Sequence, residues 1–287
     1  MQVIIVLFTI VFVLLIYSLI ETRWLKNTVY HIVSSKIPPD IDGKRIVLLS
    51  DLHTTTYGTG NTKLFRMIEG LKPDRILIAG DVINGNTSKK QFIYASELFC
   101  RLNKLNVPVY YSFGNHECRL RGFKDNYGDF KDYLELSEKF VTVLNNRSVP
   151  FDNTDSAVVT GLMLPQEQFK RKTGLKLNKP LSELLGKADE SSFNILIAHD
   201  PYYFNEYMEW GADLVVSGHI HGGIIRLPFI GGLISPRFEL FPRIDKGLYR
   251  YDDDRLMIVS GGIGWHGLPF RFLNRPEVVT IDLERRK

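Results

Sequence analysis

The amino-terminal stretch constrains this chain most, because residues 3–20, VIIVLFTIVFVLLIYSLI, contain no charged side chain. A helix of that length spans about 27 Å, which is enough to cross the hydrocarbon core of a bilayer. A cleaved signal peptide would have a basic stretch before the apolar run and a small-residue cleavage site after it, whereas this run ends in ETRW. We therefore predict an uncleaved transmembrane anchor over residues 1–22, with a signal peptide or a buried core helix as the alternatives.

Basic side chains follow this segment, and none precedes it. They are Arg23, Lys26, Lys36, Lys44 and Arg45. The positive-inside rule then places the rest of the chain on the cytoplasmic face of a cell membrane that the chain crosses once. The two cysteines, Cys100 and Cys118, are too few for a disulfide framework and agree with that compartment.

The rest of the chain has the composition of a globular protein. Of the 287 residues, 44% are hydrophobic and 24% are charged, which excludes a disordered chain. The net charge of +4 is too small to indicate nucleic-acid binding, so no nucleic-acid partner is expected. No feature of the sequence predicts a protein partner.

Short apolar runs alternate with amphipathic stretches from residue 44 onward, which is typical of a layered α/β domain. We expect one domain over residues 44–287 and, because of Pro38-Pro39 and the polar residues around them, a linker over residues 23–43. Strands are predicted at 45–50, 75–79, 107–112, 157–160, 193–198, 213–216, 247–251, 255–260 and 278–283. Helices are predicted at 61–71, 88–102 and 130–139.

Aspartate, asparagine and histidine side chains follow five of these strands directly. They are Asp51 and His53, Asp81, Asn115 and His116, His199, and the pair His219 and His221. Each has an ordinary alternative, such as a helix cap, a turn residue or a satisfied core histidine. In open α/β sheets, however, ligands bind beyond the carboxyl ends of the strands, and five coincidences together favour one site. These side chains, without cysteine, suit Mn²⁺, Fe²⁺, Zn²⁺, Co²⁺ or Mg²⁺. Seven ligands are too many for one ion and suit two.

The same five blocks, in this order, resemble the calcineurin-like metallophosphoesterases. The family pattern is D-x-H, G-D-x-x-D, G-N-H-[ED], a lone histidine and G-H-x-H, and the resemblance covers roughly residues 44–285. It implies a β-sandwich flanked by helices, an α/β/β/α fold, here with an N-terminal transmembrane helix. The anchor and the closing stretches at 261–264 and 275–277 resemble the YkuE/YaeI-type membrane-associated branch. The relatives of that branch include enzymes that hydrolyse UDP-diacylglucosamine.

The resemblance also implies a role for each site residue. The first metal ligands would be Asp51, His53 and His221, the second Asn115, His199 and His219, with Asp81 bridging both. His116 would stabilise the transition state or protonate the leaving oxygen. Asn84 stands where the family has aspartate, and we expect it to alter only the hydrogen bonding around the site. His266 and Arg271 are weaker candidates for binding a substrate phosphate, with a solvated loop as the alternative.

The expected function is that of a membrane-anchored two-metal phosphohydrolase. Its substrate would be a phosphodiester or a diphosphate, and a lipid-linked one such as UDP-diacylglucosamine is a candidate. The alternatives are a phosphomonoesterase, a protein phosphatase, or a metal-free interaction module on the same fold. Residues 227–244, LPFIGGLISPRFELFPRI, are expected to form an acyl-chain groove or a lip that faces the bilayer, unless they pack under the sheet. Deleting residues 1–20 is expected to spare the hydrolysis of a small chromogenic diester.

Overall fold

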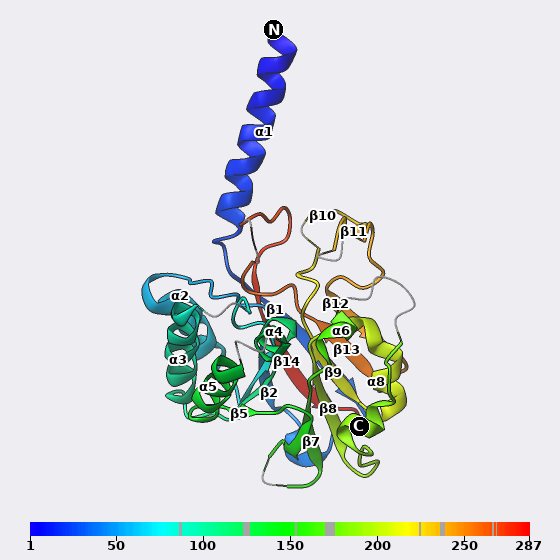
Figure 1. Ribbon diagram of the computed structural model, residues 1–287. Coiled ribbons are helices and arrows are strands. Elements are labelled where there is room, and N and C mark those ends of the chain that lie inside the picture. The colour runs from blue at the N-terminus through cyan, green and yellow to red at the C-terminus, as the bar shows by residue number, and fades with distance from the viewer. Residues whose placement is uncertain are drawn as a thin grey trace.

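Two six-stranded sheets pack face to face at the centre of the molecule (Figure 1). The computed structural model describes residues 1–85, 88–122, 127–152, 154–169, 176–223, 225–235, 239–265, 267 and 269–287. The first sheet has the order β1 (Lys26–Ser34), β14 (Glu277–Arg285), β2 (Arg45–Leu49), β3 (Arg75–Ala79), β4 (Val109–Ser112) and β5 (Thr142–Val143). The second has the order β12 (Gly247–Arg250), β13 (Leu256–Val259), β9 (Leu214–Ser217), β8 (Phe193–Ala198), β7 (Ala157–Leu162) and β6 (Arg147–Pro150).

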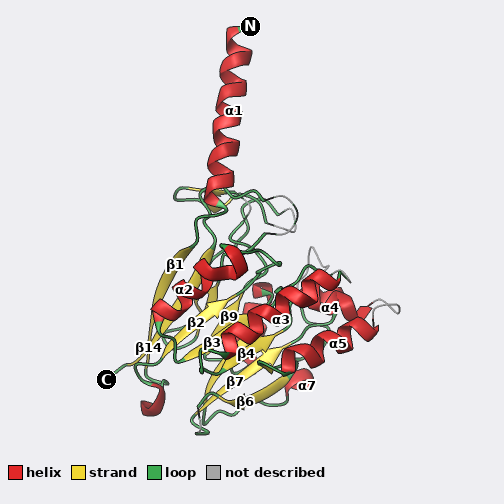
Figure 2. Ribbon diagram, turned by 90° about the vertical axis from the view of Figure 1, so that its left-hand side faces the viewer, coloured by secondary structure: helices red, strands yellow, loops and turns green. Residues whose placement is uncertain are grey.

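Helices cover the outer faces of both sheets, as Figures 1 and 2 show. On the first sheet lie α2 (Thr62–Leu71), α3 (Lys89–Asn103), α4 (Asn115–Gly122) and α5 (Tyr127–Glu138). On the second lie α6 (Gln166–Phe169), α7 (Leu181–Leu185) and α8 (Phe204–Trp210). Short 3₁₀ turns occur at Pro39–Ile41, Thr59–Asn61 and Pro201–Tyr203, and a small hairpin joins β10 (Arg226–Leu227) to β11 (Gly231–Gly232). The expected α/β/β/α arrangement is confirmed.

The central strands are apolar along their whole length because both of their faces are buried. In β2, Ile46 and Leu48 belong to the core between the sheets, whereas Val47 and Leu49 pack in the outer core beneath the helices. Alternate residues of a strand point to opposite faces, so burial on both faces requires an unbroken apolar run. Each such side chain contributes about 1.5–3 kcal/mol by leaving water. This core holds the strand ends, and hence the site, in place.

The parallel strands in each sheet end at the same edge of the sandwich. In the first sheet β2 pairs in parallel with β3, and β3 with β4. In the second sheet β7, β8, β9 and β13 are parallel in the same way. The loops that follow β2, β3, β4, β8 and β9 therefore come from both sheets and can meet at one end of the molecule.

The segment expected to be a linker contains a regular strand. β1 pairs in parallel with β14, from Lys26 opposite Glu277 to Ser34 opposite Arg285. The expectation of an irregular connection is therefore wrong for residues 26–34. The strand was missed because it lies at a sheet edge with mostly half-buried side chains, and its partner lies at the other end of the sequence. Pairing with a distant strand leaves no local pattern.

Helix α1 (Gln2–Glu21) extends away from the sandwich, as both views show. Among the described residues it is the one helix long and apolar enough to cross a membrane. Its apolar side chains are exposed along most of its length, while Ser18, Glu21 and the following Thr22 are buried against the domain. The helix thus has a free apolar part and a last turn that belongs to the domain.

Candidate metal centre

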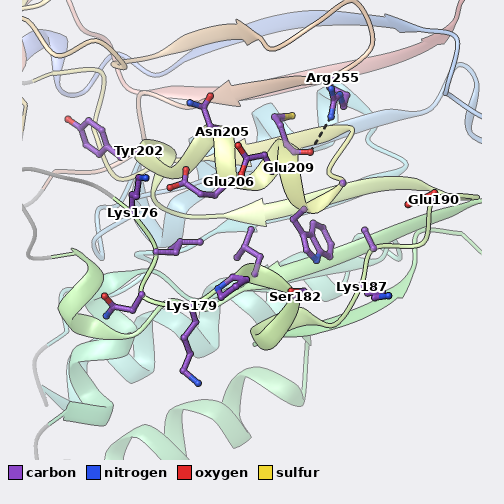
Figure 3. A pocket seen from close by; sticks show the side chains of 18 residues that line it. Lys176, Lys179, Ser182, Lys187, Glu190, Tyr202, Asn205, Glu206, Glu209 and Arg255 are labelled. Atoms are coloured by element: carbon purple, nitrogen blue, oxygen red, sulfur yellow. Dashed lines mark hydrogen bonds between the residues drawn. The ribbon is translucent and has the colours of Figure 1, made fainter.

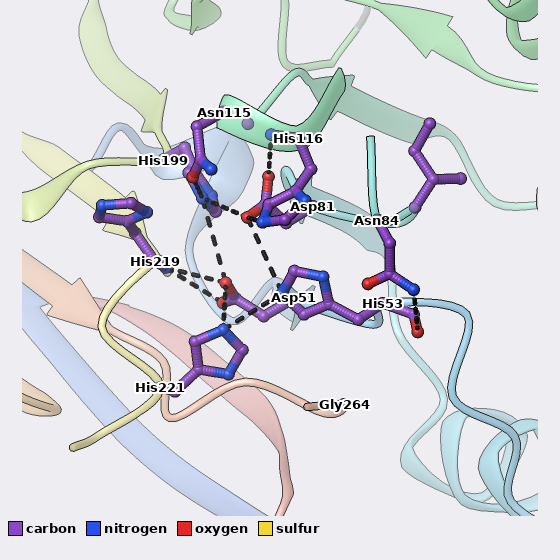
Figure 4. A network of polar contacts seen from close by, with 12 residues as sticks. Asp51, His53, Asp81, Asn84, Asn115, His116, His199, His219, His221 and Gly264 are labelled. Carbon is purple, nitrogen blue, oxygen red and sulfur yellow. Dashed lines mark hydrogen bonds and ion pairs between the residues drawn. The ribbon is translucent and has the colours of Figure 1, made fainter. Parts of the chain in front are cut away.

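The seven predicted ligands all lie at the edge where the parallel strands end (Figure 4). Asp51 and His53 follow β2, Asp81 follows β3, and Asn115 opens α4 just after β4. The remaining three are His199 after β8, and His219 and His221 after β9. Five of the seven are buried, and the other two, His219 and His221, are half-buried. The structure therefore brings together side chains from five loops and from both sheets.

Asp51, His53 and His221 form a first group whose potential ligand atoms all lie within 4.8 Å of one another. The Nε2 atoms of His53 and His221 are 3.2 Å apart. His221 Nε2 lies 3.5 Å from Asp51 Oδ1. Three donors that converge in this way can hold one cation.

A second group with the same spacing is formed by Asp81, His199 and His219. His199 Nε2 lies 3.1 Å from Asp81 Oδ2 and 3.2 Å from Asn115 Oδ1. Asp81 Oδ2 is also 3.8 Å from His53 Nε2 in the first group. Asp81 therefore lies between the two groups, where a bridging carboxylate would be needed.

In the described ion pairs of the site, every partner of the two aspartates is a histidine. Asp51 is paired with His199 and His221, and Asp81 with His53, His116 and His199. Burial of isolated carboxylates is costly, and it raises the pKa of Asp51 to about 7. Burial also lowers the pKa of His221 to about 3, which favours the neutral imidazole that a metal requires. Carboxylate, imidazole and amide donors in one place suit a divalent cation.

His199 has the opposite shift. Burial disfavours its charged form, but the adjacent Asp81 carboxylate outweighs this and raises the pKa of His199 to about 10. Its Nδ1 contacts the carbonyl oxygen of Ala79 at 2.6 Å, which orients Nε2 toward Asp81. A backbone carbonyl in this position is the usual partner of the second nitrogen of a metal-binding histidine.

The backbone at the ligands adopts a conformation that L-residues avoid. The φ angle is 51° at Asp51, 46° at His53, 54° at Asp81, 70° at His219 and 54° at His221. Each left-handed residue costs about 1–2 kcal/mol relative to a right-handed one. Strain of this kind persists where the surroundings over-determine the geometry, and it gathers at functional sites.

Glycines allow the loops to approach one another. At Gly218 an added Cβ would collide with Asp51 Oδ2, and at Gly80, where φ is 78°, it would lie 2.7 Å from His199 Nδ1. Neither position can carry a side chain without displacing a predicted ligand. The glycines around the histidine pair are thus required by close packing of the ligand loops.

Glu117 is a supporting residue to which the sequence pattern assigned no role. Its buried carboxylate accepts hydrogen bonds from the backbone nitrogens of Asp81 at 2.9 Å, Val82 at 2.8 Å and Gly114 at 2.9 Å. Burial raises the pKa of Glu117. The side chain fixes the loop after β3 against the loop after β4. Its position as the last residue of the G-N-H-E block is the signal that could have indicated this role.

His116 and Asn84 lie beside the predicted ligands. The backbone nitrogen of His116 donates to Asp81 Oδ1 at 2.8 Å, and His116 Nε2 lies 3.8 Å from Asp81 Oδ2. His116 also shares ligand-type spacing with His53 and Asp81. Asn84 Nδ2 donates to the carbonyl oxygen of His53 at 3.3 Å and to Thr54 Oγ1 at 3.2 Å. Asn84 therefore supports the His53 segment through hydrogen bonds.

Only one of the two weaker candidates lies within the described residues, and its side chain does not join the cluster. His266 lies outside the described residues. Arg271 is buried, and its guanidinium donates to the carbonyl oxygens of Gly261, Gly262, Gly264 and Asn274. In this arrangement Arg271 holds a loop together, and its contact with a substrate stays a prediction.

A separate cleft of about 940 Å³ lies between α7 and α8 (Figure 3). Basic side chains such as Lys176 and Lys187 and acidic ones such as Glu206 and Glu209 alternate along it. It contains none of the seven predicted ligands. The mixed charge gives this cleft no preference for an anionic substrate.

Comparisons with known proteins agree with the geometry. Residues 44–223 match the family model described as calcineurin-like phosphoesterase. The chain is similar to the uncharacterized metallophosphoesterase YkuE of Bacillus subtilis, with 28% identity over 92% of this chain and 87% of that protein. An uncharacterized metallophosphoesterase of Aquifex aeolicus is 29% identical over 93% and 95%. A transmembrane protein with metallophosphoesterase domain from Danio rerio is 28% identical over 95% of this chain and 61% of that protein.

Proposed function

Because this chain belongs to the calcineurin-like phosphoesterase family, we propose that it is a membrane-anchored two-metal phosphohydrolase that cleaves a phosphodiester or a diphosphate. Membership of the family makes it a metal-dependent hydrolase, as the five motif blocks predicted. The observation that carries the proposal of two ions is the presence of two separate donor groups, each with its ligand atoms within 4.8 Å of one another. Asp81 belongs to the second group and also lies 3.8 Å from His53 in the first.

In this proposal each of the seven predicted ligands would bind one of the two ions, or both. Asp51, His53 and His221 would hold one ion, and Asn115, His199 and His219 the other, with Asp81 shared. When bound, divalent ions supply Lewis acidity that lowers the pKa of water and neutralises charge on a phosphoryl group. Burial of the site excludes bulk water, which strengthens every electrostatic contact made there.

His116 is our candidate for the proton donor to the leaving oxygen. Its backbone is fixed by the bond to Asp81, and its Nε2 faces the ligand groups. An imidazole can hold a proton at Nε2 near neutral pH and release it to a departing alkoxide or phosphate oxygen. This geometry supports a role for His116 on the substrate, while the other histidines of the site would bind metal.

We extend the proposal to a lipid-linked substrate, with UDP-diacylglucosamine as one candidate. The support is the exposed apolar helix α1 on the same chain as a phosphoesterase domain. An anchored enzyme meets a membrane-bound substrate at a high effective concentration. Turnover of a lipid-linked diphosphate should then exceed turnover of its soluble head group, and equal rates would contradict the extension.

The reaction class is tested with two chromogenic substrates. A phosphodiesterase hydrolyses bis-p-nitrophenyl phosphate faster than p-nitrophenyl phosphate, whereas a phosphomonoesterase or protein phosphatase has the reverse preference. Purified protein that binds no metal after reconstitution, and hydrolyses neither substrate, would indicate the interaction module instead.

We also propose that the domain lies on the cytoplasmic face. The support is the set of basic residues that follow α1, beginning with Arg23 and Lys26. A fusion of the carboxyl terminus to a reporter that is active only in the cytoplasm should be active. A fusion active only outside the cytoplasm would contradict this orientation.

A further inference from the structure

Large apolar side chains are exposed around the base of α1. We call this set the apolar rim; its members, each at least 43% exposed, are Trp24, Phe229, Ile230, Leu240, Phe241 and Leu273. Apart from α1 itself, the other exposed large apolar side chains of the described residues are Val29, Ile93 and Tyr251. Figure 1 shows the β10–β11 hairpin at the same end of the domain as the lower end of α1. Exposed apolar surface is thus concentrated at one end of the domain.

Three members of the rim have a strained backbone. The φ angle is 66° at Phe229, 52° at Phe241 and 52° at Leu273. They are the only apolar residues with a side chain at positive φ in the part of the chain that the structure describes. Glycine or asparagine would occupy these turns at lower cost. Because Phe229 is fully exposed, packing within the domain does not offset its strain. An outlier of this kind indicates a role outside the fold.

The rim is joined rigidly to the last turn of α1. The backbone nitrogen of Arg271 donates to Ser18 Oγ at 3.0 Å, and that of Leu273 donates to Glu21 Oε2 at 2.7 Å. The rings of Tyr17 and Phe272 are in contact, with centroids 5.5 Å apart. The orientation of the domain relative to α1 is therefore set by buried hydrogen bonds. A helix that crosses a bilayer from this junction brings the rim to the membrane surface.

The same junction corrects one expectation about the anchor. Deletion of residues 1–20 would remove Ser18, the acceptor for the backbone of Arg271. Arg271 donates to the carbonyl oxygens of Gly261, Gly262 and Gly264, and the nitrogen of Gly264 donates to the carbonyl oxygen of Asp51 at 2.6 Å. Deleting the anchor is thus expected to disturb the metal site, so that a small diester is not spared.

The rim is also contiguous with a predicted metal ligand. The backbone nitrogen of Arg226 in β10 donates to the carbonyl oxygen of Phe272 at 2.9 Å. Asn274 Nδ2 donates to the carbonyl oxygen of His221 at 2.7 Å. The loops that carry the rim are therefore fastened to the loop that carries His221. A surface in contact with the rim would lie next to the site.

The polar neighbours of the rim suit a membrane interface. Trp24 lies three residues beyond the end of α1, and the guanidinium of Arg275 lies 4.1 Å from its ring centroid. Arg23 lies 4.9 Å from the ring of Trp265. Tryptophan and arginine are found where a transmembrane helix leaves the hydrocarbon core, because their rings are amphipathic and their charges reach the head groups.

We propose that the apolar rim inserts into the bilayer surface around α1, so that the domain binds the membrane at a second place and its metal site faces the lipid head groups. The proposal rests on the anchor in the proposed function, because the bilayer is identified as the partner by its continuity with α1. A rigid junction, exposed strained apolar turns and interfacial aromatic residues all point to the same occupant.

The test uses the full chain with Cys100→Ser and one new cysteine, at Phe229→Cys or, as a second position, Phe241→Cys. The cysteine carries an environment-sensitive nitrobenzoxadiazole label, and the protein is reconstituted in vesicles of phosphatidylcholine and phosphatidylglycerol. The matched control is Ile93→Cys, an exposed apolar position on α3. We expect blue-shifted emission and several-fold weaker iodide quenching at 229 and 241, and an aqueous label at 93.

The proposal would be overturned if the labels at both rim positions were as accessible to iodide as the label at 93, in a chain that resists carbonate extraction from the vesicles. Release of the chain by carbonate would overturn the anchor and the rim together. The label reports depth whether or not the protein hydrolyses a substrate. Failure of the proposed reaction is therefore distinguishable from failure of the rim.

Discussion

Two regions contain non-glycine residues at positive φ: the metal-ligand edge, where the parallel strands end, and the apolar rim. They depart from the usual burial of side chains in opposite ways. At the edge, Asp51 and Asp81 are acidic and buried. At the rim, Phe229 and Phe241 are apolar and exposed. In each region the burial of the side chains differs from what their chemistry favours in water. The difference agrees with the partner proposed for each region: cations at the edge, and an apolar phase at the rim.

Four of the five remaining non-glycine residues at positive φ show why this comparison needs residue type as well as backbone angle. Lys72 caps the carboxyl end of α2. Asn61, Asn106 and Asn146 lie in turns, where asparagine tolerates this conformation. Their angles follow from local structure alone. The outliers that point to function are those whose burial also contradicts their chemistry.

The largest effect is expected for Asp81→Asn, which removes the charge shared by both predicted ion sites. The amide oxygen can still accept from the backbone of His116, so the fold should be kept. We expect activity on bis-p-nitrophenyl phosphate to fall by about 1000-fold or more, since metal sites supply several kcal/mol of transition-state stabilisation. Metal per chain, measured by mass spectrometry, should also fall. The exposed Asp252→Asn is the matched control, and normal metal content in Asp81→Asn would contradict the bridging role.

His116→Ala should separate chemistry from metal binding at the same edge. Loss of a general acid typically costs about 100-fold or more in turnover. We expect this loss in kcat with unchanged metal content, whereas His199→Ala should lose both activity and metal. Wild-type turnover in His116→Ala would show that its assignment is wrong. Loss of metal in that variant would make it a ligand, as its spacing to His53 and Asp81 allows.

A pair of glycine-to-alanine substitutions distinguishes the cost of a positive φ angle from the cost of steric contact with Asp51. Gly43 and Gly262 have φ angles of 76° and 72°, but only at Gly262 would an added Cβ meet a neighbour, Asp51 Cβ at 2.9 Å. Gly43→Ala should lower the free energy of unfolding by about 1–2 kcal/mol and leave metal affinity unchanged. Gly262→Ala should cost more and weaken metal binding, as measured by denaturation and metal titration. Equal effects of the two substitutions would mean that the edge tolerates displacement of Asp51.

The smallest effect is expected at the rim. Phe229→Asn replaces a strained aromatic residue by one that tolerates positive φ, so the free energy of unfolding in detergent should rise by up to about 1 kcal/mol. Activity on bis-p-nitrophenyl phosphate should not change. Ile93→Asn, at an exposed apolar position in helix α3, should show no such gain. A clear loss of stability in Phe229→Asn would mean that the side chain packs within the domain, and the contrast between the two regions would fail.

Local patterns were sufficient wherever a segment is buried on both faces or ends at the site. The strand at Phe193–Ala198 agrees with its predicted bounds, and α2 begins one residue after its predicted start. Helix α4 was missed because it opens with the ligand block Asn115-His116-Glu117, whose polar residues show no helical period. β1 was missed because its partner, β14, is distant in sequence. Sequence patterns fail where a segment is stabilised by contacts with residues that lie outside that segment.

The sequence by itself determined the chemistry of this protein: the donor atoms, their order along the chain, the apolar runs that place them at strand ends, and an amino-terminal helix without charge. These are local properties of residue type and spacing, and they do not depend on which segments pack together in the fold. Only the tertiary structure decided that Glu117 clamps the Asp81 loop, that Ser18 and Glu21 lock α1 to the loop at 271–274, and that Phe229, Phe241 and Leu273 share one end. Those relations join residues far apart in the chain, and they exist only once the two sheets have packed.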